Sequence, residues 1–257
     1  MKVGLSKMGI AVNNQSLFYA ALLVVIALYI AWHEKLGLDK DMIIAVIRAV
    51  IQLVIVGYVL RYIIHLDQLW ITLIMAMFII FNASYNAMKR SALKSFKIPL
   101  AAIAIGTSIT LSGLVLAGAI KLVPFQIIPI TGMIASNAMI AVGLCFKTMD
   151  QAFKDQRQQV IEKLTLGADL KDATLPIIRL SIKTAMQPTI DGAKTVGIVS
   201  LPGMMSGLIF AGVDPVRAIK YQIMVTFMLL STASIASFIA AYLGYREYFN
   251  ARKQLKI

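Results

Sequence analysis

The sequence has few charged residues. Only 14% of its 257 residues are Asp, Glu, Lys or Arg, whereas a soluble domain usually has about a quarter. So few charges cannot cover a surface that faces water. Apolar residues make up 59% of the chain, and most of them form blocks of about 20, which is enough to cross a hydrocarbon core of about 30 Å as a helix. The sequence therefore predicts an all-α integral membrane protein.

Other absences exclude several classes of function. Cysteine occurs once, at Cys145, which excludes an internal disulfide and a cysteine-based metal cluster. The P-loop pattern G-x-x-x-x-G-K-[ST] does not occur, and Gly192-Ala-Lys194-Thr195 is only a fragment of it. If ATP energises this chain, another chain must bind it, and we expect no cofactor here.

The net charge of +13 does not indicate a nucleic-acid partner. The basic residues lie between apolar blocks and form no continuous stripe with interleaved aromatic residues. No apolar block contains a paired acid and base, a His/Glu metal motif or a nucleophile beside a base. We therefore do not expect an enzyme.

Seven apolar runs are candidate transmembrane helices, and no linker separates them, so we expect one membrane permease domain over residues 1–257. The longest polar stretch, Lys147–Lys194, follows the fifth run and is the only sizeable part expected outside the bilayer. The runs are Ser16–Trp32, Met42–Ile64, Leu69–Met88, Ile98–Ile120, Ile127–Phe146, Thr195–Gly212 and Ile219–Tyr245.

The basic residues also predict an orientation. Lys and Arg gather in short cytoplasmic loops, and most of them fall on one side if the N-terminus is outside. Lys2 and Lys7 argue the other way. We predict a multi-pass protein of the cell membrane, surrounded by lipid, with the N-terminus outside, the C-terminus in the cytoplasm and a cytoplasmic coupling region at 147–194, between helices five and six.

The coupling region has the pattern of a helical hairpin. Phe153, Val160 and Leu164 follow helical spacing, Gly167 is a helix stop, and Asp169 is placed to cap a second helix. From the pattern alone, this hairpin is either a connector on the bilayer surface or an element whose short helix, Ile161–Leu166, inserts into a groove on a soluble partner.

Several strings of residues resemble a known family. Glu162–Ala168 resembles the "EAA…G" coupling loop of ATP-binding-cassette (ABC) permeases, which contacts the ATPase subunit. Longer strings are similar to the Fet-type iron-export ABC transporter permease family, which comprises bacterial iron-export permeases and relatives including plant aluminium-tolerance permeases. These strings are Ala49–Leu53, Gly57–Leu60, Pro129–Met139, Val199–Gly207 and Ala211–Pro215, the last continuing to Tyr221-Gln222.

The resemblance implies a permease homodimer that works with two copies of a separate ATPase subunit, which binds ATP and Mg. On this basis the chain is a transport subunit that exports iron or a related metal or metal complex. The alternative is a stand-alone channel or facilitator with no nucleotide requirement. The residues expected to couple to the ATPase are Arg157, Ile161, Glu162, Leu166, Gly167 and Ala168.

Polar residues within the apolar runs are candidates for the substrate pathway. None of the seven runs contains an interior Asp or Glu, which disfavours coupling to an ion gradient because such carriers usually use buried carboxylates. Arg48 is the one charge deep in a run and should face the bundle interior. The amides either line the pathway or bond neighbouring helices together. The candidates are Arg48, Gln52, Asn82, Asn86 and Asn137.

The sixth run contains a helix breaker. Pro202 removes an intrahelical hydrogen bond and Gly203 loosens the backbone, so we predict a hinge. Met204 and Met205 follow and join the candidate pathway, where methionines act either as soft ligands or as filling between helices. The sequence indicates no metal site, and an anionic complex would suit Arg48 better than a bare cation.

Overall fold

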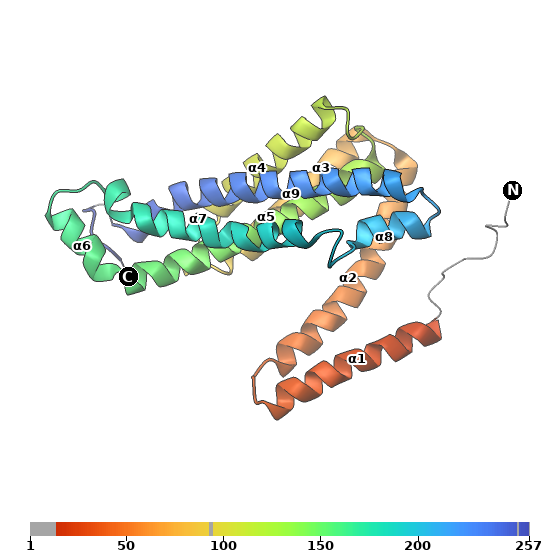
Figure 1. Ribbon diagram of the computed structural model, residues 1–257, viewed down its shortest axis with the longest axis horizontal. Coiled ribbons are helices and arrows are strands. Elements are labelled where there is room, and N and C mark those ends of the chain that lie inside the picture. The colour runs from red at the N-terminus through yellow and green to blue at the C-terminus, as the bar shows by residue number, and fades with distance from the viewer. Residues whose placement is uncertain (1–13, 93–94, 251, 257) are drawn as a thin grey trace, which may run out of the picture. The chain divides into compact units, whose positions relative to one another are not determined.

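The computed structural model describes residues 14–92, 95–250 and 252–256. Apart from two isolated β-bridges, every regular element in this part of the chain is a helix (Figure 1). Lys2, Lys7 and Lys94, which contributed to the predicted orientation, lie outside the described residues. Contacts divide the chain into two units, Met1–Leu66 and Asp67–Ile257.

The first unit is a helical hairpin. Helix α1 (Asn14–His33) packs against α2 (Asp39–Leu66), and the turn between them places Lys35 and Gly37 in the left-handed backbone region, at φ 49° and 68°. Both helices are apolar almost all round, and most of their large side chains are exposed. Surfaces of this kind need lipid or other protein to cover them.

The second unit is a bundle centred on one long helix. Helix α5 packs against α3, α4, α7 and α9, and α9 also packs against α4, α7 and α8. The elements are α3 (Leu69–Met88), α4 (Lys97–Leu116), α5 (Pro124–Asp155), α6 (Arg157–Thr165), α7 (Leu170–Thr195), α8 (Gly203–Phe210), α9 (Pro215–Gly244) and the 3-10 helix η1 (Tyr245–Tyr248). We call the two ends of this bundle the α6 end and the α8 end (Figure 1).

Small residues allow α4 and α9 to approach closely. A Cβ atom added at Gly106 would lie 3.4 Å from the Cβ of Ala236. One turn further along α4, the Thr232 hydroxyl donates a 2.8 Å hydrogen bond to the Thr110 hydroxyl in the buried interface. Helices in a membrane are held together by this kind of packing and by such polar bonds, because the hydrophobic effect no longer favours their association.

Among the described residues, six helices are long and apolar enough to cross a membrane: α1 to α5 and α9. The chain is thus a multi-pass membrane protein. The predicted sixth span, Thr195–Gly212, is interrupted. Helix α7 ends at Thr195, residues 196–202 are not helical, and α8 has only 8 residues, or about 12 Å. The prediction of seven continuous spans is therefore not confirmed.

The predicted helical hairpin is present at the α6 end. Gly167 adopts φ 89°, its N–H donates to the Leu164 carbonyl at 3.1 Å, and the Ala168 N–H donates to the Lys163 carbonyl at 3.0 Å. These two bonds form a Schellman motif, which satisfies carbonyls at the end of α6. Asp169 occupies the N-cap position of α7 but makes no side-chain capping bond.

The polar stretch Lys147–Lys194 lies differently from the prediction. Lys147 continues α5, which ends only at Asp155, and α7 packs alongside α5 and α9 as part of the bundle (Figure 1). The reason is that α7 is amphipathic, and it buries Ile177, Ile178 and Ala185 against its neighbours. Its mean hydropathy is low because the other face is polar, so a search for apolar runs misses it.

Asp150 joins three segments at the α6 end. Its carboxylate accepts a 2.9 Å hydrogen bond from the backbone N–H of Ala92 and another from the Tyr248 hydroxyl. The Tyr248 ring stacks on Phe153 with centroids 4.3 Å apart. The loop after α3, the end of α5 and the C-terminal segment are thereby fixed together.

We expect Asp150→Ala to destabilise the folded protein by about 1–3 kcal/mol, because it leaves the buried Tyr248 hydroxyl without its acceptor. The measurement is the thermal unfolding midpoint in detergent. Tyr248→Phe is the control, since it keeps the ring stack and removes both the donor and the need for an acceptor. Equal midpoints for Asp150→Ala and the wild type would contradict the assigned role.

Candidate functional site

A cavity of about 470 Å³ lies where α7 ends and α8 begins. Helices α5 and α9 form its other walls. Its lining combines amide and hydroxyl side chains with apolar residues and two methionines. The lining residues with thioether, amide or threonine side chains are Met133, Asn137, Thr189, Met204, Gln222 and Thr226.

Asn137 fixes the depth of this cavity. Its amide nitrogen donates to the backbone carbonyl of Leu229 on α9 at 3.0 Å, and its amide oxygen accepts from the Thr189 hydroxyl on α7 at 3.2 Å. Asn137 lies near the middle of the apolar run Ile127–Phe146, which has the length of a hydrocarbon core. The cavity and the last turns of α7 therefore lie level with the middle of this run.

Gln222 in the cavity wall has an unused acceptor. The residue is buried, with 5% of its surface exposed, and among the described residues its Oε1 atom, itself covered, has no hydrogen-bond partner. The residue lines the first cavity and a second one of about 340 Å³. A buried acceptor without a partner costs about 1–3 kcal/mol, so rotation of this amide towards a ligand in either cavity would relieve that cost.

The break between α7 and α8 forms one side of the cavity. Gly197 adopts φ 84°, a backbone conformation that side chains with a Cβ disfavour. Pro202, with φ −60° and ψ 147°, is the N-cap of α8, and Gly203 is its first residue. Irregular backbone at membrane depth is tolerated only where protein or a water-filled cavity surrounds it, and the lining includes Val196, Ser200, Pro202 and Gly203.

Comparison with known proteins assigns the chain to a family. Residues 14–249 match the model of the "Uncharacterised protein family (UPF0014)". The chain belongs to the UPF0014 family. No solved structure matches it.

Several UPF0014 relatives are similar over almost their whole length. The chain is 56% identical over 248 residues to "Probable iron export permease protein FetB" of Escherichia coli (strain K12), covering 96% of both chains. It is 35% identical over 243 residues to "UPF0014 membrane protein YjkA" of Bacillus subtilis (strain 168), covering 94% and 97%. It is 33% identical over 239 residues to "Protein ALUMINUM SENSITIVE 3" of Arabidopsis thaliana, covering 92% and 88%. The predicted resemblance to bacterial iron-export and plant aluminium-tolerance permeases is confirmed.

The UPF0014 structure gathers only some of the predicted pathway residues. Asn137 and Met204 line the main cavity together with Pro202 and Gly203, and Met205 lines the second cavity beside it. Met133 and Met204 also line a third cavity of about 470 Å³. The methionine side chains therefore line the same cavities as amide and hydroxyl side chains.

The remaining predicted pathway residues lie elsewhere. Asn86 donates to Asn82 of the same helix, to the side-chain oxygen at 2.7 Å and to the backbone carbonyl at 2.8 Å. This pair on α3 does not line the three cavities. Arg48 and Gln52 are exposed on α2, which belongs to the first unit of the UPF0014 chain.

Three cavity residues escaped the sequence reasoning. Gln222 is a single amide in the last apolar run, so a search of that run for polar side chains would have found it, and Thr226 lies one turn along. Thr189 could not be found in this way, because the whole stretch Lys147–Lys194 reads as polar and was placed outside the membrane.

One acidic residue lies close to the cavity, although the seven apolar runs contain no interior Asp or Glu. Asp191 comes two residues after Thr189, or about 3 Å further along α7. It is therefore close to the level of Asn137 on α5. A carboxylate that faced lipid would cost at least about 2.5 kcal/mol, so Asp191 needs polar partners at this level.

The described part of this UPF0014 chain contains no group of three or more His, Cys, Asp or Glu residues that could hold a metal ion. Amide, hydroxyl and thioether groups are the cavity's polar atoms. Such groups bind a bare iron ion weakly, because iron sites usually use carboxylate, imidazole or thiolate ligands.

The predicted coupling residues lie together at the α6 end. Arg157, Ile161, Gly167 and Ala168 line a cavity of about 680 Å³, whose other wall is the C-terminal segment Arg252–Leu255. Glu162 is exposed and accepts a 3.0 Å bond from Gln158. Leu166 is 87% exposed at this turn.

Proposed function

We propose that the chain is the membrane-spanning permease subunit of an ABC transporter and exports iron or a related metal complex. In this proposal two copies of the chain form a homodimer. A separate ATPase subunit binds ATP and Mg and supplies the energy. The name of the E. coli relative, an iron export permease, supports the substrate class.

The observation that carries the proposal is the path of α7. The helix starts directly after the Gly167 turn, where Leu166 is exposed, and its last turns line the cavity at Asn137. One helix of 26 residues, about 39 Å long, therefore connects the exposed turn at Leu166 with the cavity beside Asn137.

This connection provides a mechanism. ATP binding by the docked subunit would displace α6, and α7 would transmit the displacement along its axis. The break at 196–202 would absorb the movement, because its backbone is outside any helix and contains the left-handed Gly197. The cavity between α7 and α8 would thereby open or close. The α6 end faces the cytoplasm in this proposal.

The docking claim has a direct test. Replacing Glu162 and Leu166 with arginine is expected to abolish co-purification of the ATPase subunit, because it puts two cations and extra volume at the exposed turn. Leu116→Arg is the matched control. Leu116 is also 87% exposed, but it ends α4, next to the loop that leads into the first residue of α5 at the α8 end.

Unchanged co-purification of the double variant would remove the docking claim. Transport by the purified chain in liposomes without any ATPase would instead support the stand-alone facilitator. The two measurements together separate a misplaced docking surface from a wrong energy source.

A further inference from the structure

Helix α7 carries a polar stripe on its exposed face. Lys183, Gln187, Asp191 and Lys194 are all exposed, and their spacing of four, four and three residues places them on one side of a helix. The opposite side buries Ile178 and neighbouring residues in the bundle core. We call these four residues the α7 stripe.

The α7 stripe lies level with the apolar run of α5. Thr189 is bonded to Asn137, near the middle of that run. With a rise of about 1.5 Å per residue, Lys183 lies about 9 Å from that level towards the α6 end, and Lys194 lies about 8 Å beyond it. Both distances are inside a hydrocarbon core about 30 Å thick that is centred on Asn137. Helix α7 is not among the described helices that are long and apolar enough to span a membrane by themselves.

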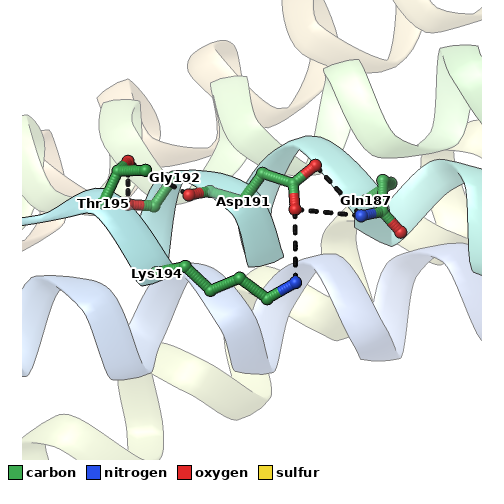
Figure 2. A network of polar contacts seen from close by, with 5 residues as sticks. All are labelled: Gln187, Asp191, Gly192, Lys194 and Thr195. Atoms are coloured by element: carbon green, nitrogen blue, oxygen red, sulfur yellow. Dashed lines mark hydrogen bonds and ion pairs between the residues drawn. The ribbon is translucent and has the colours of Figure 1, made fainter. Parts of the chain in front are cut away.

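The charges of the stripe are only partly compensated. Gln187 donates to both Asp191 carboxylate oxygens, at 2.9 and 3.0 Å, and Lys194 lies 3.5 Å from one of them (Figure 2). Asp191 and Lys194 thus neutralise each other. Within the described residues, neither Lys183 nor Arg179, one turn earlier on the same helix, forms an ion pair. The uncompensated charges along this face are positive.

Lipid cannot cover this face, because three charged groups and an amide at membrane depth need water or protein partners. We propose that the α7 stripe lines a water-filled translocation path, which runs from the α6 end to the break beside Gln222, and that this path selects anions. The inference deepens the proposed transport function. Its substrate is an anionic complex of a metal with carboxylate- or phosphate-type ligands, and Arg179 and Lys183 attract it at the α6 end.

Water access to the stripe is tested by thiol labelling. In a Cys145→Ala background, which removes the single cysteine, Gln187→Cys and Asp191→Cys in membranes are expected to react with water-soluble methanethiosulfonates. Ile140→Cys is the control. It lies three residues from Asn137, at a similar depth, and replaces an exposed apolar side chain. Stripe cysteines as unreactive as this control would overturn the path.

Anion selection is tested by the charge of the reagent. Rates at Gln187→Cys are compared for an anionic sulfonate and a cationic trimethylammonium methanethiosulfonate, each divided by its rate with a small thiol in solution. Two uncompensated cations at about 10 Å in water-like surroundings favour the anionic reagent by about tenfold. Adding Lys183→Glu is expected to remove this preference. A preference for the cationic reagent in the parent chain would overturn anion selection.

These experiments need neither an ATPase nor a known substrate. The path can therefore fail while the double arginine variant at Glu162 and Leu166 still loses its partner, which would leave the transport proposal intact. Conversely, labelling of the stripe cysteines together with unchanged ATPase co-purification of the double arginine variant would contradict the docking surface and support the path.

Discussion

Gln222→Leu is expected to reduce transport about tenfold while thermal stability stays equal or rises, because an unpartnered acceptor costs about 1–3 kcal/mol when no ligand uses it. Among the described residues the buried Gln222 oxygen has no partner, and the residue lines two cavities. Replacing it with a side chain of similar size relieves that cost and removes the amide from both cavity walls. Transport in cells and the unfolding midpoint in detergent measure the two effects separately.

Thr107→Val provides the matched control for Gln222. The Thr107 hydroxyl is also fully buried and without a partner, but it does not line the cavities around the break. We expect this variant to be as stable as the wild type or more so, with normal transport. If Gln222→Leu transports normally as well, the oxygen is a packing defect and not part of the substrate site.

Gly197→Val is expected to abolish most transport. Gly197 adopts φ 84°, and a left-handed conformation costs a residue with a Cβ about 1–2 kcal/mol, more when the side chain is β-branched. The break would have to change its course beside the cavity, where Val196 and Ser200 form part of the wall. A transport assay, with the amount of protein in the membrane determined in parallel, checks the result.

Gly203→Ala tests whether this effect is specific. An added Cβ at Gly203 meets no atom within 4 Å, and the residue already begins α8, so alanine should be tolerated. The opposite result, with transport lost in Gly203→Ala and normal in Gly197→Val, would contradict a hinge at Gly197. It would support the hinge at Pro202-Gly203 that the sequence predicts.

Much of the membrane architecture was predictable because apolar runs of sufficient length have few alternatives to a spanning helix. The predicted run Leu69–Met88 coincides with α3, and the predicted helix stop at Gly167 is present, with a left-handed backbone. The orientation, the single-domain organisation and the ATPase contact stay predictions.

The position of α7 was not predictable from hydropathy. Its polar stripe lowers the average over any window, although its opposite face is as apolar as a core helix requires. Only tertiary contacts, above all the bond between Thr189 and Asn137, reveal its depth. The same bond brings Asp191 close to the level of Asn137, whereas Asn86 donates to Asn82 on α3, away from the cavity.

The C-terminal segment described at the α6 end affects how the complex can be purified. Residues Arg252–Leu255 form one wall of the same cavity as the coupling residues Arg157 and Ile161, and the Lys256 backbone N–H donates to the Tyr248 carbonyl at 2.9 Å. An affinity tag fused behind this segment would sit beside the docking surface and compete with the ATPase subunit for space. A tag at the opposite terminus avoids this false negative.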